Sequence, residues 1–225
     1  MTAANALTTP VNKGHESMAY LTYLIDNYAH LPSTIAFLHA HRSGFLNAWH
    51  VDASLHDNVA AMRTLQLPFV QENGYVNLRC KWNPGCVESH RLNRHVTEEV
   101  WREVFDGTST PPLLLDVHPP LDNGDDVDGD DDDDDEQDEA MYEAAAAAAA
   151  ERGKGLLQQN PMFFPRQVGA ACCAQFAVSR NQVLRRPRED YIRFREWVTQ
   201  TDRDSASSGR VMEFLWHVIF GKEAV

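Results

Sequence analysis

Long apolar runs are missing from this sequence of 225 residues. No stretch approaches the roughly 18 to 20 consecutive apolar residues that are needed to span a bilayer. The first ten residues also lack the basic and apolar regions of a signal peptide. These two absences predict a cytoplasmic protein that makes no contact with a membrane.

Cysteine is scarce as well, with four residues in the whole chain. In a cytosolic protein of this size, four cysteines favour buried thiols or a functional site over a disulfide scaffold. Their spacing matches no common zinc-site pattern. We therefore expect a fold that needs no oxidation, with structural thiols at Cys80, Cys86, Cys172 and Cys173.

Basic residues are absent from Asp122 to Glu143, a segment that holds 14 of the 33 acidic residues. This segment carries essentially all of the net charge of -13, so the rest of the chain is close to neutral. A like-charge run this dense should stay solvated, and the alanines that follow extend it. We therefore expect a single α/β domain over residues 1–225, interrupted by a disordered acidic and poly-alanine insert at 122–155.

Apolar spacing divides the remaining chain into helices and strands. Apolar residues at helical spacing predict the helices, and short apolar or alternating runs predict the strands. Thr97 is a plausible N-cap, since acidic residues follow it in the first turn. The expected helices cover residues 16–28, 57–67, 97–105, 190–200 and 210–220, and the expected strands cover residues 34–39, 75–80 and 172–180.

Polar side chains follow the first expected strand, at His39, His41 and Arg42. Ligands of open α/β sheets collect at the carboxyl ends of strands, so these residues stand where chemistry is expected. Alternate strand residues point the same way, and two imidazoles could ligate one metal. A pair of hydrogen-bonded histidines that orients a substrate is the commoner arrangement, and no metal site is assigned here.

The last expected helix carries Arg210, Glu213 and His217. Glu213 and His217 are four residues apart and share a helix face, so they could share a proton or bind a cation. Glu213 could equally pair with a guanidinium, either from this chain or from a ligand. An internal salt bridge within the helix is a third possibility, and the sequence leaves all three open.

Asp190 lies in the most basic neighbourhood of the chain. Such a neighbourhood could contact the phosphates of a nucleotide or an RNA. A solvated helix face is the commoner meaning of a run of this kind. The bases around Asp190 are Arg180, Arg185, Arg186, Arg188, Arg193 and Arg195.

Five segments of the chain, read together, resemble a fungal family known as a domain of unknown function. Five blocks in the same order are far more specific than any one of them. The blocks are NKGHESMAYLTYLIDNY at 12–28, FLHAHR at 37–42, GYVNLRC at 74–80, CCAQFAVSR at 172–180 and SGRVMEFLWHVIFG at 208–221.

This family includes the arginine-containing cyclodipeptide synthases, which join arginine to a second amino acid using aminoacyl-tRNAs. The resemblance implies an enzyme of secondary metabolism, with arginyl-tRNA and a second aminoacyl-tRNA as partners and no cofactor. Family members usually have a further strand region ahead of the first block. We therefore expect this chain to be shortened at its N-terminus.

The fourth block also looks like part of the nucleotide-sugar glycosyltransferases of the A-type, Rossmann-like fold. The resemblance therefore implies a mixed sheet flanked by helices. The histidines of His39-Ala-His41 stand where those enzymes carry a metal-binding acidic pair. The alternatives to a cyclodipeptide synthase are a nucleotide-sugar glycosyltransferase-like protein and a catalytically degenerate relative that only binds.

The family's activity suggests roles for the residues of the matching blocks. An arginine substrate needs a carboxylate, for which we expect Glu213 first, then Asp190, then Glu16. His217 or His39 would act as the base. The remaining substrate-binding candidates, which include residues that would face tRNA phosphate or the ester carbonyl, are His41, Arg42, Arg79, Gln175, Arg180 and Arg210.

Overall fold

The structure of the chain is a computed structural model. It describes residues 8–42, 51–79, 95–109, 112, 164–165 and 167–224. The predicted acidic insert at 122–155 lies outside the described residues, as do Cys80, Cys86 and the side chain of Cys172.

Three short strands form the described sheet: β1 (Thr34–Phe37), β2 (Tyr75–Asn77) and β3 (Phe176–Ser179). β3 lies between the other two and runs antiparallel to both. Phe176, at the start of β3, is opposite Phe37 on one side and Asn77 on the other. The carboxyl ends of β1 and β2 therefore meet the beginning of β3 at one end of the sheet.

The described sheet is antiparallel throughout, whereas the sequence predicted a mixed sheet. A Rossmann-like arrangement is not shown by the described strands, although the α/β class is confirmed. All four residues of β3 are buried, as in a parallel strand that is covered on both faces. Burial on both faces produces this apolar pattern in either direction, so the pattern does not reveal how a strand pairs.

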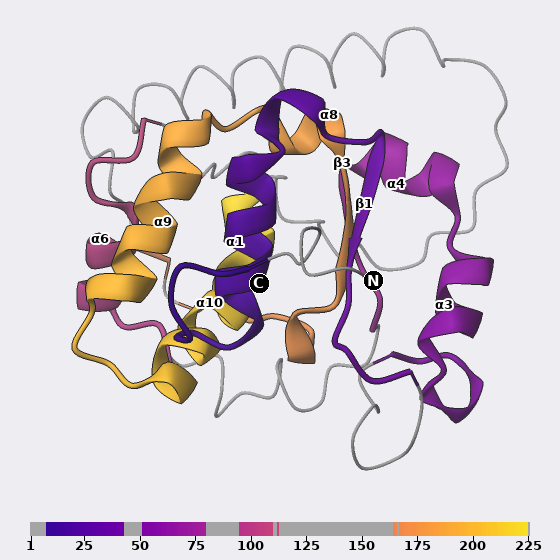
Figure 1. Cartoon of the computed structure of the whole chain (residues 1–225), viewed down its shortest axis with the longest axis horizontal. Helices are drawn as coiled ribbons and strands as arrows, with labels where there is room; N and C mark the ends of the chain where they lie inside the picture. The colour runs from indigo at the N-terminus through magenta and orange to yellow at the C-terminus, as the bar shows by residue number, and fades with distance from the viewer. Residues whose placement is uncertain are drawn as a thin grey trace, which may run out of the picture.

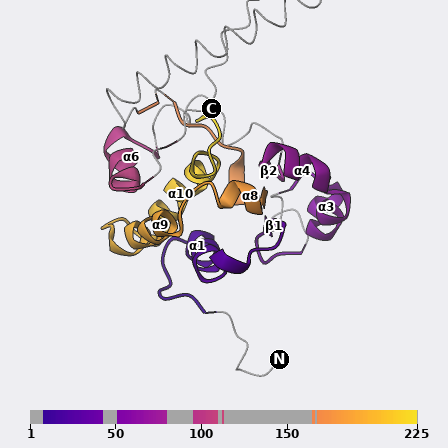
Figure 2. The same cartoon turned by 90° about the horizontal axis from the view of Figure 1, so that it is seen from above.

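Helices cover both faces of the sheet (Figures 1 and 2). On one face lie α1 (Glu16–Asp26) and α10 (Ser205–Ile219), with α9 (Arg188–Gln200) and α6 (Glu98–Phe105) farther from the strands. On the other side lies α4 (Leu67–Asn73), which contacts all three strands, with α3 (Asn58–Thr64) next to it.

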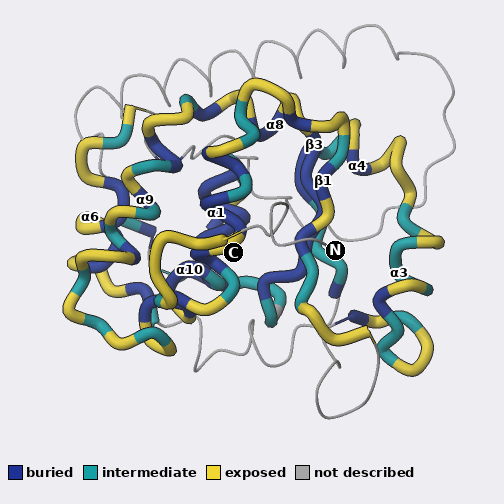
Figure 3. Tube along the Cα trace, viewed as in Figure 1, coloured by how far each residue is buried: buried dark blue, intermediate teal, exposed yellow. Residues whose placement is uncertain are grey.

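Aromatic rings join the sheet to its first helical layer. Tyr20 of α1 and Trp216 of α10 have ring centroids 6.0 and 5.5 Å from that of Phe176. Contacts of this kind add about 0.5–1.5 kcal/mol to the stabilisation that comes from burial alone. Figure 3 shows the result, since the buried stretches run along α1, α10 and the strands.

The helix expected over residues 57–67 is confirmed as α3, although it ends at Thr64, and α4, which begins at Leu67, was not predicted. Leu65 and Gln66 between them have extended backbones. Pro68 explains the break, because proline inside a helix loses a hydrogen bond but fits in the first turn of a new one. The other helix predictions are confirmed within a few residues, including the Thr97 cap, whose hydroxyl accepts from the Val100 N–H at 3.3 Å.

The expected strand over residues 172–180 begins later than predicted. Cys172–Ala174 forms a single 3-10 turn, η4, ahead of β3, and α8 (Arg180–Val183) follows the strand. Two further 3-10 turns are η2 (Tyr28–His30) and η3 (Ser54–His56). The η4 turn places its residues at the sheet end where β1 and β2 finish.

Candidate functional site

The end of the sheet where β1 and β2 finish brings together three predicted site residues. His39 follows β1, Arg79 follows β2, and Gln175 directly precedes β3. They meet because β1 and β2 run in the same direction on either side of β3. This sheet end is also where α1 begins and where η4 lies (Figure 1).

His39 is held by hydrogen bonds from both sides of its backbone. Its N–H donates to Oε1 of Gln175 at 2.7 Å, and its carbonyl accepts from Nδ2 of Asn58 at 3.4 Å. Burial lowers the pKa of His39, and the nearby His41 and His15 lower it further. At neutral pH the imidazole is therefore uncharged and able to accept a proton.

His41 and Arg42 have exposed side chains, and their backbone carbonyls are fixed by Asn58. Nδ2 of Asn58 donates to the carbonyl of His41 at 2.6 Å, and its backbone N–H donates to that of Arg42 at 2.9 Å. In the described part of the chain, no three His, Cys, Asp or Glu side chains form a group that could hold a metal.

Glu213 of α10 has both carboxylate oxygens engaged. Oε1 accepts from the backbone N–H of Cys173 in η4, and Oε2 pairs with Nη1 of Arg210 at 2.5 Å. The Glu213 side chain is 10% exposed, and that of Arg210 is 49% exposed. Burial raises the pKa of Glu213, and nearby Glu16 raises it too, whereas Arg210 and the Cys173 N–H act against this rise.

Glu16 supplies a second carboxylate at the first residue of α1. Burial raises its pKa, against the lowering effect of its own backbone N–H, His15 and Arg210. Among the described residues, no hydrogen bond joins its carboxylate to another residue. Glu16 is therefore a partly buried acid that is near an ion pair but not part of it.

A glycine lets the start of α1 approach α10. A Cβ added at Gly209 would lie 3.1 Å from the carbonyl oxygen of Gly14 and 3.1 Å from Cδ2 of His15. Contacts this short mean that a larger side chain at position 209 would require the start of α1 to shift by a few tenths of an ångström. The small size of Gly209 thus sets how close Glu16 can lie to the Arg210–Glu213 pair, and we call these three residues the carboxylate site.

Cys173 corrects the prediction of free structural thiols, since it takes part in a disulfide bond. Its sulfur partner lies outside the described side chains.

Cys173 has φ 86° and Ala174 has φ 46°, a left-handed backbone that non-glycine residues seldom adopt. Strained backbone of this kind persists only where its surroundings impose it and is frequent at functional sites. Here it aims the Cys173 N–H at Glu213, and Arg79 Nη1 lies 3.8 Å from the Cys173 sulfur.

His217 lies one turn after Glu213, as predicted, but belongs to the core. Burial lowers its pKa to about 4, although a hydrogen bond with the backbone of Ala224 opposes this. Its Nε2 has no hydrogen-bond partner within the described residues. A neutral, enclosed imidazole is a poorer candidate for a base than His39.

Asp190 lies away from the carboxylate site, in a buried ion pair. Its Oδ2 is 3.0 Å from Nη1 of Arg186, and its Oδ1 accepts from the Ser109 N–H at 2.7 Å. Arg180 is distant as well, because it follows the other end of β3 and has an exposed side chain. The structure therefore gathers the other predicted residues, except His217, around one sheet end and places these two elsewhere.

Sequence reasoning missed three participants near this sheet end. The Cys173 N–H is a backbone donor, for which a sequence gives no signal. Asn58 was assigned only to a helix, whose cap is Asp57, and no local pattern marks its contacts with the carbonyls of His39 and His41. Tyr20 is one turn after Glu16, and its hydroxyl is buried without a partner among the described residues. Burial raises the pKa of Tyr20, and Glu16 adds to the rise.

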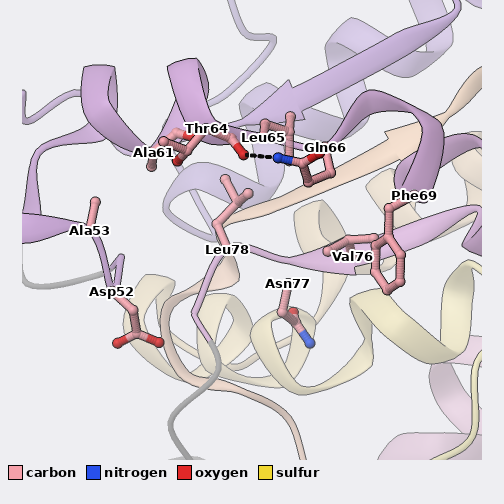
Figure 4. Close-up of a pocket in the computed structure, with 10 residues that line it drawn as sticks. All are labelled: Asp52, Ala53, Ala61, Thr64, Leu65, Gln66, Phe69, Val76, Asn77 and Leu78. Atoms are coloured by element: carbon pink, nitrogen blue, oxygen red, sulfur yellow. Dashed lines mark hydrogen bonds between the residues drawn. The ribbon is translucent and has the colours of Figure 1, made fainter.

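A cleft of about 340 Å³ lies along β2, on the side of α3 and α4 (Figure 4). This is within the range of about 300–1,000 Å³ that is usual for small-molecule sites. Thr64 and Gln66 line it, and the Gln66 side chain donates to the Thr64 carbonyl at 3.2 Å. None of the predicted site residues lines this cleft, although Arg79 directly follows its strand.

The fold and the site together define an α/β protein with a pair of partly buried carboxylates at one end of a small sheet. Such a pair can bind a cation or move a proton. The chain belongs to a family described as a protein of unknown function (DUF3431), whose model matches residues 2–225. The prediction of a domain-of-unknown-function family is confirmed at this level. No curated protein and no solved structure matches the chain.

The described helices also bear on the predicted absence of a membrane span. None of those within residues 8–42, 51–79, 95–109 and 167–224 is both long and apolar enough to cross a bilayer.

Proposed function

We propose that this protein is an aminoacyl-tRNA-dependent cyclodipeptide synthase that joins arginine to a second amino acid. The observation that supports it is the carboxylate site, where a guanidinium already rests on a nearly buried carboxylate beside a second acid. Guanidinium and carboxylate groups match in shape and charge, and the match is strongest where water is excluded. A site of this kind suits an arginine side chain.

The reaction joins two aminoacyl esters in two steps. The amine of one aminoacyl group attacks the ester carbonyl of the other, so that an amide bond forms and a tRNA hydroxyl leaves with the proton. The free amine of the resulting dipeptidyl ester then attacks the remaining ester carbonyl, so that a second amide bond closes the ring and the second tRNA hydroxyl leaves with the proton. Since both esters are already activated, the protein has to position the reactants and move protons.

Each residue at the sheet end has a role in this proposal. Glu213 and Glu16 hold the arginine side chain, and His39 takes the proton from the attacking amine. His39 suits this role because it is uncharged at neutral pH and held by Gln175. Arg42 is exposed at the same end and meets the negative charge of the tRNA acceptor end, whereas Arg79 is buried there.

Two sequence expectations change in this proposal. Asp190 is not an arginine-binding residue, because both of its oxygens are engaged in the core. His217 is not the base, because it is enclosed and uncharged. Both keep the fold intact instead.

Expression in a bacterial host tests the proposal directly. We expect a new arginine-containing cyclic dipeptide by mass spectrometry, and ribonuclease treatment of the lysate should abolish its formation. Glu213→Gln should remove at least nine tenths of the product, because an amide cannot neutralise a guanidinium. Glu196→Gln, at an exposed position of α9, is the matched control and should leave the product unchanged.

Two outcomes would contradict the proposal. Thermal stabilisation by a nucleoside diphosphate with a divalent cation, with no dependence on RNA, would favour a glycosyltransferase-like protein. A well-folded protein that yields no cyclic dipeptide would favour a relative that only binds.

A further inference from the structure

We propose that the Arg210 side chain occupies the binding position of the substrate's guanidinium in the free protein and leaves when that substrate binds. This inference rests on the proposed function, because that function makes arginine the ligand. Arg210 is thereby a competitor of the substrate, rather than a residue that faces tRNA phosphate or the ester carbonyl. The support comes from the unequal surroundings of the three residues of the carboxylate site.

The two partners of the Arg210–Glu213 pair differ in their exposure to solvent. The Arg210 side chain is half exposed, whereas that of Glu213 is nearly buried. A half-exposed guanidinium has water on one side, and water can replace the contacts that its N–H groups make there. Arg210 can therefore exchange for an incoming guanidinium, which keeps the nearly buried Glu213 carboxylate paired while Arg210 moves into solvent.

Glu213 stays in place when Arg210 leaves. Its other oxygen accepts the backbone N–H of Cys173, which belongs to a residue held by a disulfide bond. The left-handed backbone at Cys173 and Ala174 fixes the direction of that N–H. The carboxylate is thus pre-organised for a guanidinium, and pre-organisation lowers the cost of binding.

Glu16 gives an incoming guanidinium an advantage over Arg210. Arg210 pairs with Glu213, and no ion pair joins it to Glu16 within the described residues. A guanidinium has five N–H donors in a planar fork, so a free ligand can contact two carboxylates at once. Glu16 is close enough for its charge to act on Glu213, and Arg210 acts electrostatically on both acids.

Binding of L-arginine amide to the whole chain, measured by titration calorimetry at pH 8, tests this inference. The amide imitates an arginyl ester but does not react. Arg210→Ala should bind it about tenfold more tightly than the natural protein, because the internal competitor is gone. Arg210→Met keeps the aliphatic stem and should give the same gain if the alanine variant is poorly folded.

Two controls make the result specific. Arg203→Ala removes the same charge near the start of α10 without touching Glu213, and it should leave the affinity unchanged. Citrulline amide has nearly the same shape but no charge, and it should gain nothing from Arg210→Ala. Adding Glu16→Gln to the Arg210→Ala variant should abolish the gain.

Weaker or unchanged binding in both Arg210 variants would overturn the inference, as would a natural protein and variants that all fail to bind arginine amide. The product assay separates this failure from that of the proposed function. Tighter binding by Arg210→Ala with no cyclic dipeptide would support the guanidinium-binding position and contradict the proposed synthase activity. A cyclic dipeptide with no change in binding would do the reverse.

Discussion

Replacing Asp190 by asparagine should destabilise the protein severely, although the predicted substrate-binding role would make the change harmless to the fold. The Asp190 side chain is 0% exposed and that of Arg186 is 3% exposed. Arg186 also donates from Nε to the carbonyl of Ile219 at 3.0 Å and lies 5.3 Å from the ring centroid of Phe194. The substitution removes the negative charge of Asp190 from this buried guanidinium.

Removing one partner of a buried ion pair typically costs about 3–5 kcal/mol. The amide oxygen of the introduced asparagine would still accept the Ser109 N–H, so the lost charge accounts for most of the effect. For a chain of this size, a loss of about 4 kcal/mol corresponds to a fall in Tm of roughly 8–16 °C. It is also a large part of the total stability of a typical domain, about 5–15 kcal/mol.

Urea unfolding followed by circular dichroism measures this change, with the slope of the transition held common to both proteins. Glu98→Gln is the matched control, since it removes an acid from the Arg102–Glu98 pair, where both side chains are more than half exposed. That change should cost less than about 1 kcal/mol. If Asp190→Asn shifted the midpoint no more than Glu98→Gln, the reasoning on the buried pair would be wrong.

Three further predictions concern other parts of the chain. The folded-state pKa of His217, about 4, lies below its unfolded value of 6.5, so the unfolded chain takes up the proton first. Stability from this group is therefore complete above pH 6.5 and falls by about 3 kcal/mol toward pH 4, and His217→Gln should lose that slope in urea titrations. Gly209→Ala should weaken the binding of arginine amide about tenfold by pushing the start of α1 away, whereas the exposed Ser207→Ala should not; equal binding by both would contradict the role of Gly209. Deleting residues 122–150 should leave a soluble protein with an unchanged far-ultraviolet spectrum, and loss of soluble protein would show that the insert supports the fold.

Local sequence patterns predicted the helices and strands well because each depends on neighbours in the chain. The apolar spacing around Leu21, Leu24 and Ile25 reports a buried helix face directly. Thr97 indicated a helix start for the same local reason. The start of α4 was also available from the sequence, since proline is frequent in the first turn of a helix, but this short helix was missed.

The pairing of strands and the partners of charged residues depend on distant contacts, which local patterns do not encode. Asp190 and Glu213 look alike as acids beside arginines, yet one has a core arginine and the other a half-exposed one. Likewise, no local pattern distinguishes His39 from His217. The structure places His39 at a sheet end and encloses His217 in the core. The disulfide at Cys173 was missed because the cysteines were judged by the expected cytosolic location of the protein and not by their positions in the fold.

The pairing of β2 with β3 also explains how the chain can carry so long an acidic segment. β3 begins opposite the residue at which β2 ends, so the chain returns to the point that it left. The entropy needed to close such an excursion grows only with the logarithm of its length, by about 0.6 kcal/mol for each doubling. Removing 122–150 about halves the stretch between Phe105 and Phe164, and the expected gain is of that small size. The length of the segment between β2 and β3 therefore has little effect on the free energy of unfolding. Its charge can change without a cost that comes from loop closure.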